Sequence, residues 1–184
     1  KYGLENMLPS FNEHLKILSN SGVDLIILEA MSSQSEIVEA LLKCSKNINL
    51  PIWLSISCVF DKNKEIYLGY DDDVKNDKPQ IYENFKESLY KFKKIHTGPI
   101  LVAHSNMSVT DEAIKILKDN YNQIIGAYPN RGYFEKPKWK FIDNIQPKDY
   151  LDKAKSWKNN GAQIIGGCCG IGVEEIKAIS ILKN

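Results

Sequence analysis

Short apolar runs alternate along this chain with segments of helical periodicity, and this alternation constrains the fold more than any other feature. Five runs are apolar over nearly their whole length, as expected of parallel strands that are buried on both faces. They cover residues 23–30, 52–58, 100–105, 123–129 and 163–169. Helical patterns lie before, between and after them, over residues 8–21, 35–46, 82–96, 110–120, 147–160 and 173–182. Strict alternation predicts an α/β fold in which helices connect the strands of a parallel sheet.

Residues with strong positional preferences mark several helix ends. Thr110 is a favourable N-cap, and Pro147 suits the first turn of its helix because proline lacks an amide hydrogen. Gly161 follows a helical pattern and predicts its C-terminal end. Two polar segments, 61–78 and 131–146, are predicted to be long loops over the strand ends, where such loops often close over a substrate.

Five strands are too few to close a barrel of eight. The alternation therefore leaves two architectures open: an open five-stranded sheet, or the second part of a (β/α)8 TIM-type barrel whose first three units lie outside this sequence. No internal repeat or interdomain linker divides the chain, so we expect residues 1–184 to belong to one domain.

Composition argues against several classes of function. The 184 residues carry a formal net charge of +1, which gives no general electrostatic reason to expect nucleic acid or an acidic membrane as a partner. No apolar run approaches the roughly 20 residues of a membrane-spanning helix, and the first residues lack the apolar core of a signal peptide. The four cysteines are not spaced like a secreted disulfide framework, so we expect a cytoplasmic protein.

Residues able to do chemistry collect at the carboxyl ends of the apolar runs. They are Glu29, Cys58, His104, Asn130, Cys168 and Cys169. Barrels and open α/β sheets both place their active sites at this edge. Cys168 and Cys169 are framed by glycines, which permit the turn that two neighbouring side chains need to reach one ion. The pair predicts a thiolate metal site, with zinc as the preferred ion.

A longer segment around the two cysteines carries a family resemblance. Residues 161–170 read Gly-Ala-Gln-Ile-Ile-Gly-Gly-Cys-Cys-Gly. This strongly resembles the end of the homocysteine S-methyltransferase domain, where a signature of this form supplies two zinc thiolates. Earlier segments are similar to the family in the same order: residues 21–29, which end in Leu-Glu, residues 53–57 (Trp-Leu-Ser-Ile-Ser) and residues 128–132 (Tyr-Pro-Asn-Arg-Gly). The similarity covers essentially the whole chain, and the double cysteine is its most specific part.

The resemblance implies a (β/α)8 barrel, of which this chain matches roughly the last five β/α units. It would then be the C-terminal portion of the homocysteine-binding domain, with the first three units absent. Five strands alone expose an inner face and two sheet edges. We therefore expect association, either with the missing N-terminal part or with further copies in a homo-oligomer.

The zinc site implied by the resemblance departs from the family pattern at one ligand. The family takes its first cysteine ligand from the strand that here reads Leu-Val-Ala-His-Ser, and His104 falls on the cysteine position. Imidazole binds zinc well, so His104, Cys168 and Cys169 would form a Cys2His site with an open fourth position. The alternative is loss of the thiolate site, with His104 hydrogen-bonded in the barrel mouth.

The implied activity is a zinc-dependent methyl transfer to the thiol of homocysteine, which gives methionine. Zinc deprotonates a bound thiol, and the thiolate is the reactive nucleophile. The methyl donor would be a small molecule such as S-methylmethionine or betaine. Glu29 resembles the carboxylate that holds the substrate amino group, and Asn130 is a candidate substrate-binding residue. A solvated acid at the rim and a purely structural Tyr-Pro-Asn turn are the respective alternatives.

Two other functions stay open at this point. One is a non-catalytic relative of the family whose altered site only binds zinc. The other is a redox protein that uses Cys168 and Cys169 as a vicinal disulfide. Cys58 also ends an apolar run, but the family pattern places no ligand there.

Overall fold

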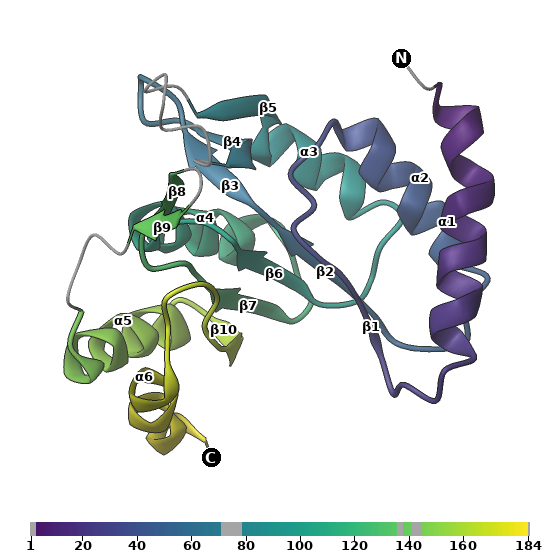
Figure 1. Cartoon of the computed structure of the whole chain (residues 1–184). Coiled ribbons are helices and arrows are strands. Elements are labelled where there is room, and N and C mark those ends of the chain that lie inside the picture. The colour runs from purple at the N-terminus through teal and green to yellow at the C-terminus, as the bar shows by residue number, and fades with distance from the viewer. Residues whose placement is uncertain (1–2, 71–78, 136–137, 141–144, 184) are drawn as a thin grey trace.

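Five parallel strands form the central sheet, in the order in which they occur along the chain (Figure 1). The computed structural model describes residues 3–70, 79–135, 138–140 and 145–183. The strands are β1 (Ile26–Leu28), β2 (Ile52–Ile56), β6 (Ile100–Ala103), β7 (Ile125–Tyr128) and β10 (Ala162–Ile165). Each pairs in parallel with the next in this series. Apart from shifts at their ends they coincide with the five apolar runs, so the predicted parallel sheet is confirmed.

Helices connect the strands and pack against one another in sequence, α1 on α2 and so on to α6. They are α1 (Leu4–Ser19), α2 (Ser35–Ser45), α3 (Phe85–Phe92), α4 (Met107–Asn120), α5 (Pro147–Asn159) and α6 (Val173–Ile179), which a short 3-10 turn, η2 (Ser180–Leu182), extends. Because the strand order never reverses, every connection steps in one direction and the helices gather on one face. A doubly wound sheet would reverse, so this order is that of a barrel segment. None of the described helices is both long and apolar enough to cross a membrane.

Alternate strand residues pack beneath the helices and form the core. The fully buried members of this layer include Leu54, Ile56, Ile100 and Val102 from the strands, and Leu89, Phe92, Val109, Ile114 and Leu117 from α3 and α4. Removing each such side chain from water stabilises the fold by about 1.5–3 kcal/mol. The central strand β6 is buried over its whole length, which explains its unbroken apolar sequence.

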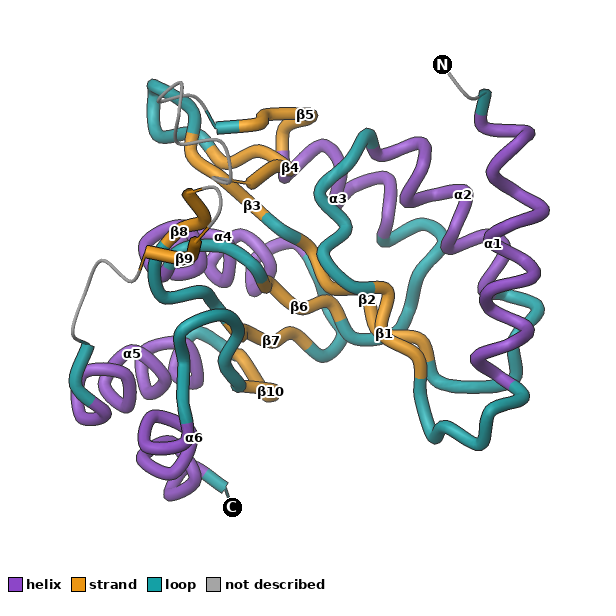
Figure 2. The backbone as a smooth tube through the Cα atoms, viewed as in Figure 1, coloured by secondary structure: helices purple, strands orange, loops and turns teal. Residues whose placement is uncertain are grey.

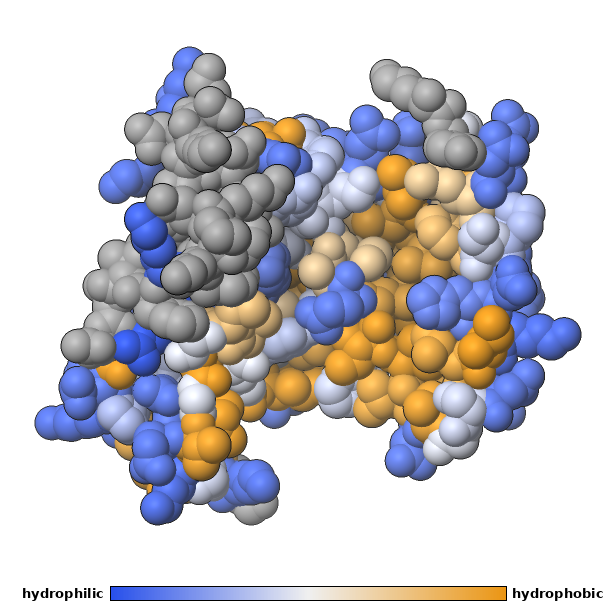
Figure 3. Space-filling view, viewed as in Figure 1, coloured by the Kyte–Doolittle hydropathy of each residue, from blue (hydrophilic) through white to orange (hydrophobic). Residues whose placement is uncertain are grey.

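The other face of the sheet is an inner face. Side chains of Ser55 and Leu101 alternate here with the core residues of their strands. Gly126 belongs to the same row, and a Cβ on it would lie 2.3 Å from Leu101 Cδ2, so the close packing requires glycine. Figure 3 shows hydrophobic residues gathered around a hollow on this side, over β1 and toward α1. Ile27 of the edge strand β1 is accordingly 39% exposed.

The segment after β2 forms a second, antiparallel sheet, so the predicted loop over residues 61–78 is wrong in part. Strands β3 (Cys58–Phe60), β4 (Ile66–Tyr70) and β5 (Gln80–Asn84) pair in that order, beyond the end of β2 (Figure 1). The Asp61 carboxylate accepts hydrogen bonds from the backbone N–H groups of Asn63 and Glu65, which closes the β3–β4 turn. Residues 71–78 lie outside the described part of the chain.

The predicted loop over residues 131–146 also contains strands. β8 (Tyr133–Glu135) pairs with β9 (Lys138–Lys140) in a short antiparallel hairpin. Residues 136–137 and 141–144 of this segment lie outside the described residues. Both corrections have the same cause, since short strands flanked by charged residues give a weak local signal.

Helix ends follow the predicted signals in α5 and differ in three other helices. α1 covers Leu4–Ser19 and not residues 8–21. α5 begins at Pro147, and Gly161 beyond its end has a φ of 92°. α4 begins three residues before Thr110, because Asn106 is the N-cap and its side chain accepts a hydrogen bond from the N–H of Val109. α3 begins at Phe85 and not at residue 82, and Asn84 is its N-cap.

Candidate metal centre

Three potential ligand side chains meet where β6 and β10 end. His104 follows β6, while Cys168 and Cys169 follow β10, which lies on the other side of β7. Their ligand atoms all lie within 4.8 Å of one another, and they form the one group of this kind in the described part of the chain. The two sulfur atoms are 3.9 Å apart and both thiols are free, so no vicinal disulfide joins them.

The loop after β10 is held by the loop after β7. The N–H of Cys168 donates to the carbonyl of Pro129 at 3.0 Å, and the carbonyl of Cys169 accepts from the N–H of Arg131 at 2.7 Å. Figure 2 shows these two loops side by side at one end of the sheet. Because the hydrogen bonds lie on either side of the cysteine pair, they fix its backbone before any ligand binds.

Two glycines make this turn possible. Gly170 has a φ of 81°, in the left-handed region that glycine adopts at no steric cost. A Cβ on Gly167 would lie 2.3 Å from a methyl carbon of Ile171. The glycine frame predicted to allow a turn therefore does so at both positions.

His104 occupies a strained backbone conformation at the end of β6. Its φ is 46°, in the left-handed region that costs a non-glycine residue about 1–2 kcal/mol. The Ser57 hydroxyl donates to the His104 carbonyl at 2.7 Å, and the carbonyl of Ser105 accepts from the N–H of Asn130 at 2.9 Å. Neighbouring strands thus hold the residue in this conformation, as is common for residues at functional sites.

Asn130 joins both halves of the cluster. Its side-chain nitrogen lies 3.4 Å from His104 Nδ1, and its side-chain oxygen accepts the N–H of Cys169 at 3.2 Å. The residue is buried. These contacts are with the cluster itself, so the structure gives Asn130 an orienting position, and substrate binding by Asn130 stays a prediction.

The environment of Cys168 favours its ionised form. A hydrogen bond with the His104 side chain lowers the pKa of the Cys168 thiol, and this outweighs the opposite effect of partial burial. The backbone and side chain of Cys169 lower it further. A thiol of this kind is a better metal ligand than an ordinary one, because the thiolate is the form that binds.

The donor set and its spacing fit a zinc ion. Tetrahedral zinc with sulfur ligands at about 2.3 Å places two sulfur atoms about 3.8 Å apart, and the two thiols here are separated by 3.9 Å. Two sulfurs and one imidazole nitrogen are ligands that zinc prefers, whereas calcium and magnesium prefer oxygen. Three protein ligands would leave the fourth tetrahedral position for another molecule.

Glu29 lies outside this cluster, at the end of β1, and its carboxylate is engaged by two other strands. The hydroxyl oxygen of Tyr128 lies 3.0 and 2.9 Å from the two carboxylate oxygens. Ser55 Oγ lies 3.2 Å from one of them and also contacts the Tyr128 hydroxyl. The grouping was not predicted, because it depends on the curvature of the sheet. Its one sequence signal is the Tyr-Pro-Asn segment.

Tyr128 is a neutral hydrogen-bond donor over the ordinary pH range. Burial raises the pKa of its hydroxyl, and the nearby charge of Glu29 raises it as well, although the contact with Ser55 acts in the opposite direction. The phenol therefore keeps its proton, and the carboxylate of Glu29 can accept it as a hydrogen bond.

Cys58 is set apart from the cluster although it also follows a strand of the central sheet. It begins β3, its side chain is 1% exposed, and its N–H donates to Ser105 Oγ at 2.8 Å. Burial raises the pKa of its thiol strongly. Such a thiol behaves as a small apolar side chain.

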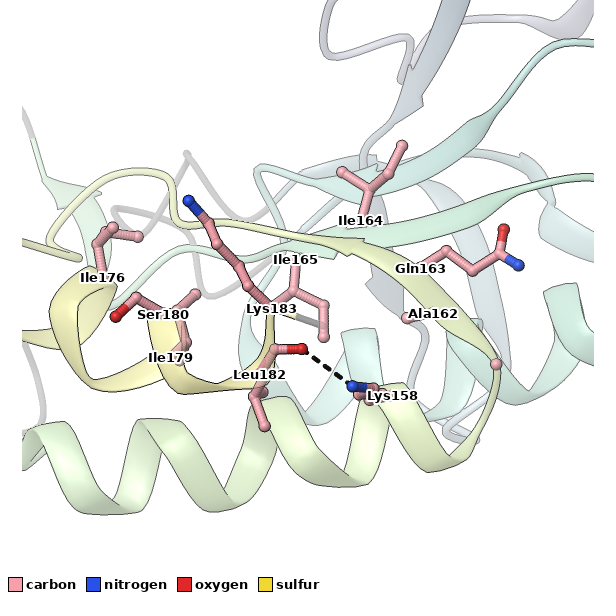
Figure 4. Close-up of a pocket in the computed structure, with 11 residues that line it drawn as sticks. Lys158, Ala162, Gln163, Ile164, Ile165, Ile176, Ile179, Ser180, Leu182 and Lys183 are labelled. Carbon is pink, nitrogen blue, oxygen red and sulfur yellow. Dashed lines mark hydrogen bonds between the residues drawn. The ribbon is translucent and has the colours of Figure 1, made fainter.

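An apolar cavity of the described residues lies away from the cluster. It has a volume of about 770 Å3 and runs along the free edge of β10, beneath α6. Figure 4 shows Ile165, Ile176 and Ile179 around it, with the Lys158 ammonium group donating to the carbonyl of Leu182 at its rim. Its lining is largely apolar and carries no cysteine or histidine, so the candidate metal ligands and this cavity are separate features.

Comparison with known proteins places the chain in a family. The model of the homocysteine S-methyltransferase family matches residues 2–182. The chain belongs to the homocysteine S-methyltransferase family. Among curated relatives, homocysteine S-methyltransferase 3 of Zea mays is 30% identical over 99% of this chain and 51% of its own length. The selenocysteine methyltransferase of Astragalus bisulcatus is 26% identical over 90% of the chain and 46% of its own length.

Solved structures confirm the barrel-type fold of this family member. The apo form of the homocysteine methyltransferase MmuM from Escherichia coli superposes with a TM-score of 0.69 at 16% identity, over all of this chain and 59% of that chain. The metallated form of the same protein gives a TM-score of 0.66 at 16% identity, over 96% of this chain and 52% of that one. The chain therefore spans about half the length of the relatives it matches, in line with the predicted C-terminal portion of the domain.

Proposed function

We propose that this chain carries the metal-binding and part of the substrate-binding half of a barrel enzyme that methylates homocysteine. The enzyme would transfer a methyl group from a small donor, such as S-methylmethionine or betaine, to the thiol of homocysteine and give methionine. One observation carries the proposal: in a member of this family, His104, Cys168 and Cys169 converge within 4.8 Å at the carboxyl edge of the sheet.

In this proposal His104, Cys168 and Cys169 hold a zinc ion. When bound, zinc would supply a Lewis acid that favours the thiolate form of a substrate sulfur at neutral pH. The chain keeps the three ligands in place through Asn130 and the hydrogen bonds between the two loops. Free cysteines of this kind persist in a reducing compartment, which supports a cytosolic location.

The remaining residues of the site bind and orient the substrate. The Glu29 carboxylate would pair with the ammonium group of homocysteine, an interaction stronger than a neutral hydrogen bond. The thiol proton leaves before the transfer. A sulfur–carbon bond then forms to the donor methyl group, the bond between that methyl group and the donor breaks, and its electron pair stays with the demethylated donor.

We also propose that residues 1–184 are completed by further β/α units of the same barrel. Among the described residues β1 and β10 each pair with a single strand, so each has a free edge. The apolar cavity along β10 and the exposed side chains of Ile176 and Ile181 are surfaces that a further strand and helix would bury. Further copies of this chain are the alternative occupants.

Metal content and product formation test the proposal together. The purified protein, assembled with the units that complete its barrel, should contain one zinc ion and form methionine from homocysteine with S-methylmethionine or betaine. His104→Ala should lose both properties, whereas the matched control His14→Ala changes an exposed histidine of α1 and should keep both.

Two results would contradict parts of the proposal. Zinc bound without methionine formation in the assembled protein would favour the non-catalytic relative. Absence of zinc in a folded protein would remove the proposed site altogether. Light scattering on the same samples reports assembly, and a stable monomer of these 184 residues alone would contradict the barrel-completion proposal.

A further inference from the structure

Tyr128 and Ser55 approach the carboxylate of Glu29 from the inner face of the sheet. The Tyr128 hydroxyl reaches both carboxylate oxygens, at 3.0 and 2.9 Å, and Ser55 Oγ reaches one of them at 3.2 Å. Glu29 itself is exposed, Tyr128 is half-buried and Ser55 is fully buried. An exposed glutamate normally samples several rotamers, but here two partners fix the carboxylate from behind and leave its other side open.

Glu29 and Tyr128 come from strands that are not neighbours, whereas Ser55 lies on β2, next to β1. In the sheet order β1-β2-β6-β7-β10, Glu29 follows β1 and Tyr128 ends β7, so two strands lie between them. At about 4.8 Å per strand, the two backbones would be about 14 Å apart in a flat sheet. The contact exists because the sheet curves and the two side chains meet across the inner face. It therefore spans the mouth of the barrel.

The segment that carries Tyr128 also carries the contacts to the metal-ligand cluster. Two residues further along, Asn130 contacts His104 and the N–H of Cys169, and the Pro129 carbonyl between them accepts the N–H of Cys168. Residues 128–130 thus touch the carboxylate at one end and the ligand cluster at the other. Such a rigid link sets the spacing between a site for an ammonium group and a site for a sulfur atom.

From this geometry we infer that Tyr128, supported by Ser55, is a positioning residue that makes Glu29 selective for thiols bearing an α-ammonium group. The inference rests on the proposed function and adds the residues that determine its substrate class. Tyr128 donates to the carboxylate and leaves its charge intact, so the open side of Glu29 presents a fixed anion to the ammonium group. Without the phenol hydroxyl, the carboxylate is free to turn and the ammonium group loses a preorganised partner.

A pair of thiols that differ only in the amino group provides the test. Homocysteine carries the ammonium group, and 4-mercaptobutyrate has the same thiol, chain length and carboxylate without it. Calorimetric titration of the zinc-loaded protein should show homocysteine binding about 10-fold or more tightly than 4-mercaptobutyrate, as expected for a charge-assisted hydrogen bond. Tyr128→Phe should remove most of this preference by weakening homocysteine binding alone, while zinc content stays unchanged.

Matched variants separate positioning from a general structural effect. Tyr90→Phe makes the same chemical change at an exposed tyrosine of α3 and should keep the preference. Ser55→Ala should reduce the preference in the same direction as Tyr128→Phe, which keeps the test usable if one variant folds poorly. In steady-state assays Tyr128→Phe should raise KM for homocysteine and leave kcat nearly unchanged.

The possible failures are distinguishable. Equal weakening of both thiols in folded Tyr128→Phe would overturn the positioning role and leave the proposed function standing. An unchanged preference in both Tyr128→Phe and Ser55→Ala would overturn it as well. If the zinc-loaded parent binds neither thiol, the proposed function fails and this inference fails with it.

Discussion

Cys168 and Cys58 both lie just beyond strands of the same parallel sheet, yet the structure gives them opposite chemistry. Cys168 is half-buried and its pKa is lowered, chiefly by the hydrogen bond with His104. Cys58 is fully buried among apolar residues, and burial alone raises its pKa. The carboxyl edge of the sheet is therefore not sufficient to make a ligand. A polar partner and an open side decide which thiol can bind a metal.

The largest effect predicted from this comparison is a loss of zinc affinity when the sulfur of Cys168 is removed. Cys168→Ser should weaken zinc binding by more than about 100-fold, because loss of a direct ligand exceeds the 10- to 100-fold typical of outer partners. Cys58→Ser should leave the affinity unchanged, since Cys58 is outside the ligand group. Competition titration with a chromophoric chelator measures both variants. Equal losses of zinc affinity in the two variants would show that the environments of Cys168 and Cys58 do not differ as described.

Zinc affinity should fall by a smaller factor when the three proposed ligands are kept and the side chain that orients them is removed. Asn130→Ala deletes the contacts to His104 and to the N–H of Cys169 while keeping all three ligand side chains. We expect zinc affinity to fall by about 10- to 100-fold, as for other residues that orient metal ligands. The same titration applies, with Asn120→Ala as a control at the far end of α4. An affinity equal to that of the parent would mean that the loops alone position the ligands.

Burial of the Cys58 thiol should change how the free energy of unfolding depends on pH. Cys58 has a raised pKa in the folded state, whereas an unfolded thiol titrates near 8.5. Above that pH the unfolded chain loses a proton that the folded chain keeps, so the stabilising contribution present at lower pH is lost as the pH rises. In urea unfolding with chelator and reductant between about pH 8.5 and 10, the free energy of unfolding should fall with pH more steeply than in Cys58→Ala. The difference in slope should approach about 1.4 kcal/mol per pH unit toward about pH 10. Equal pH dependence of the free energy of unfolding in the parent and in Cys58→Ala would contradict the burial of the Cys58 thiol.

Local patterns were sufficient to predict the main sheet and its helices. The residues of β6 are buried on both faces, so their apolar character follows directly from their position. Pro147 and Gly161 mark the ends of α5 through backbone preferences that operate in any context. The antiparallel strands β3 to β5 were missed because they are short and flanked by charged residues, and their pairing depends on a turn centred on Asp61.

The site was predictable to a different extent at each residue. Proximity of Cys168 and Cys169 follows from adjacency and the glycine frame. The approach of His104 required the family resemblance, since nothing local connects β6 with β10. The contact between Tyr128 and Glu29 could not be predicted, because it arises from the curvature of the sheet, which no short sequence pattern encodes.

The left-handed backbone at position 104 affects the outcome of directed evolution of this protein. The steric penalty belongs to the position and applies to nearly every side chain placed there, including the cysteine of the family pattern. Glycine escapes it but offers no donor atom. A screen that rewarded heat tolerance alone would therefore favour His104→Gly, which removes one of the three proposed metal ligands, so such a campaign needs a simultaneous selection for metal binding.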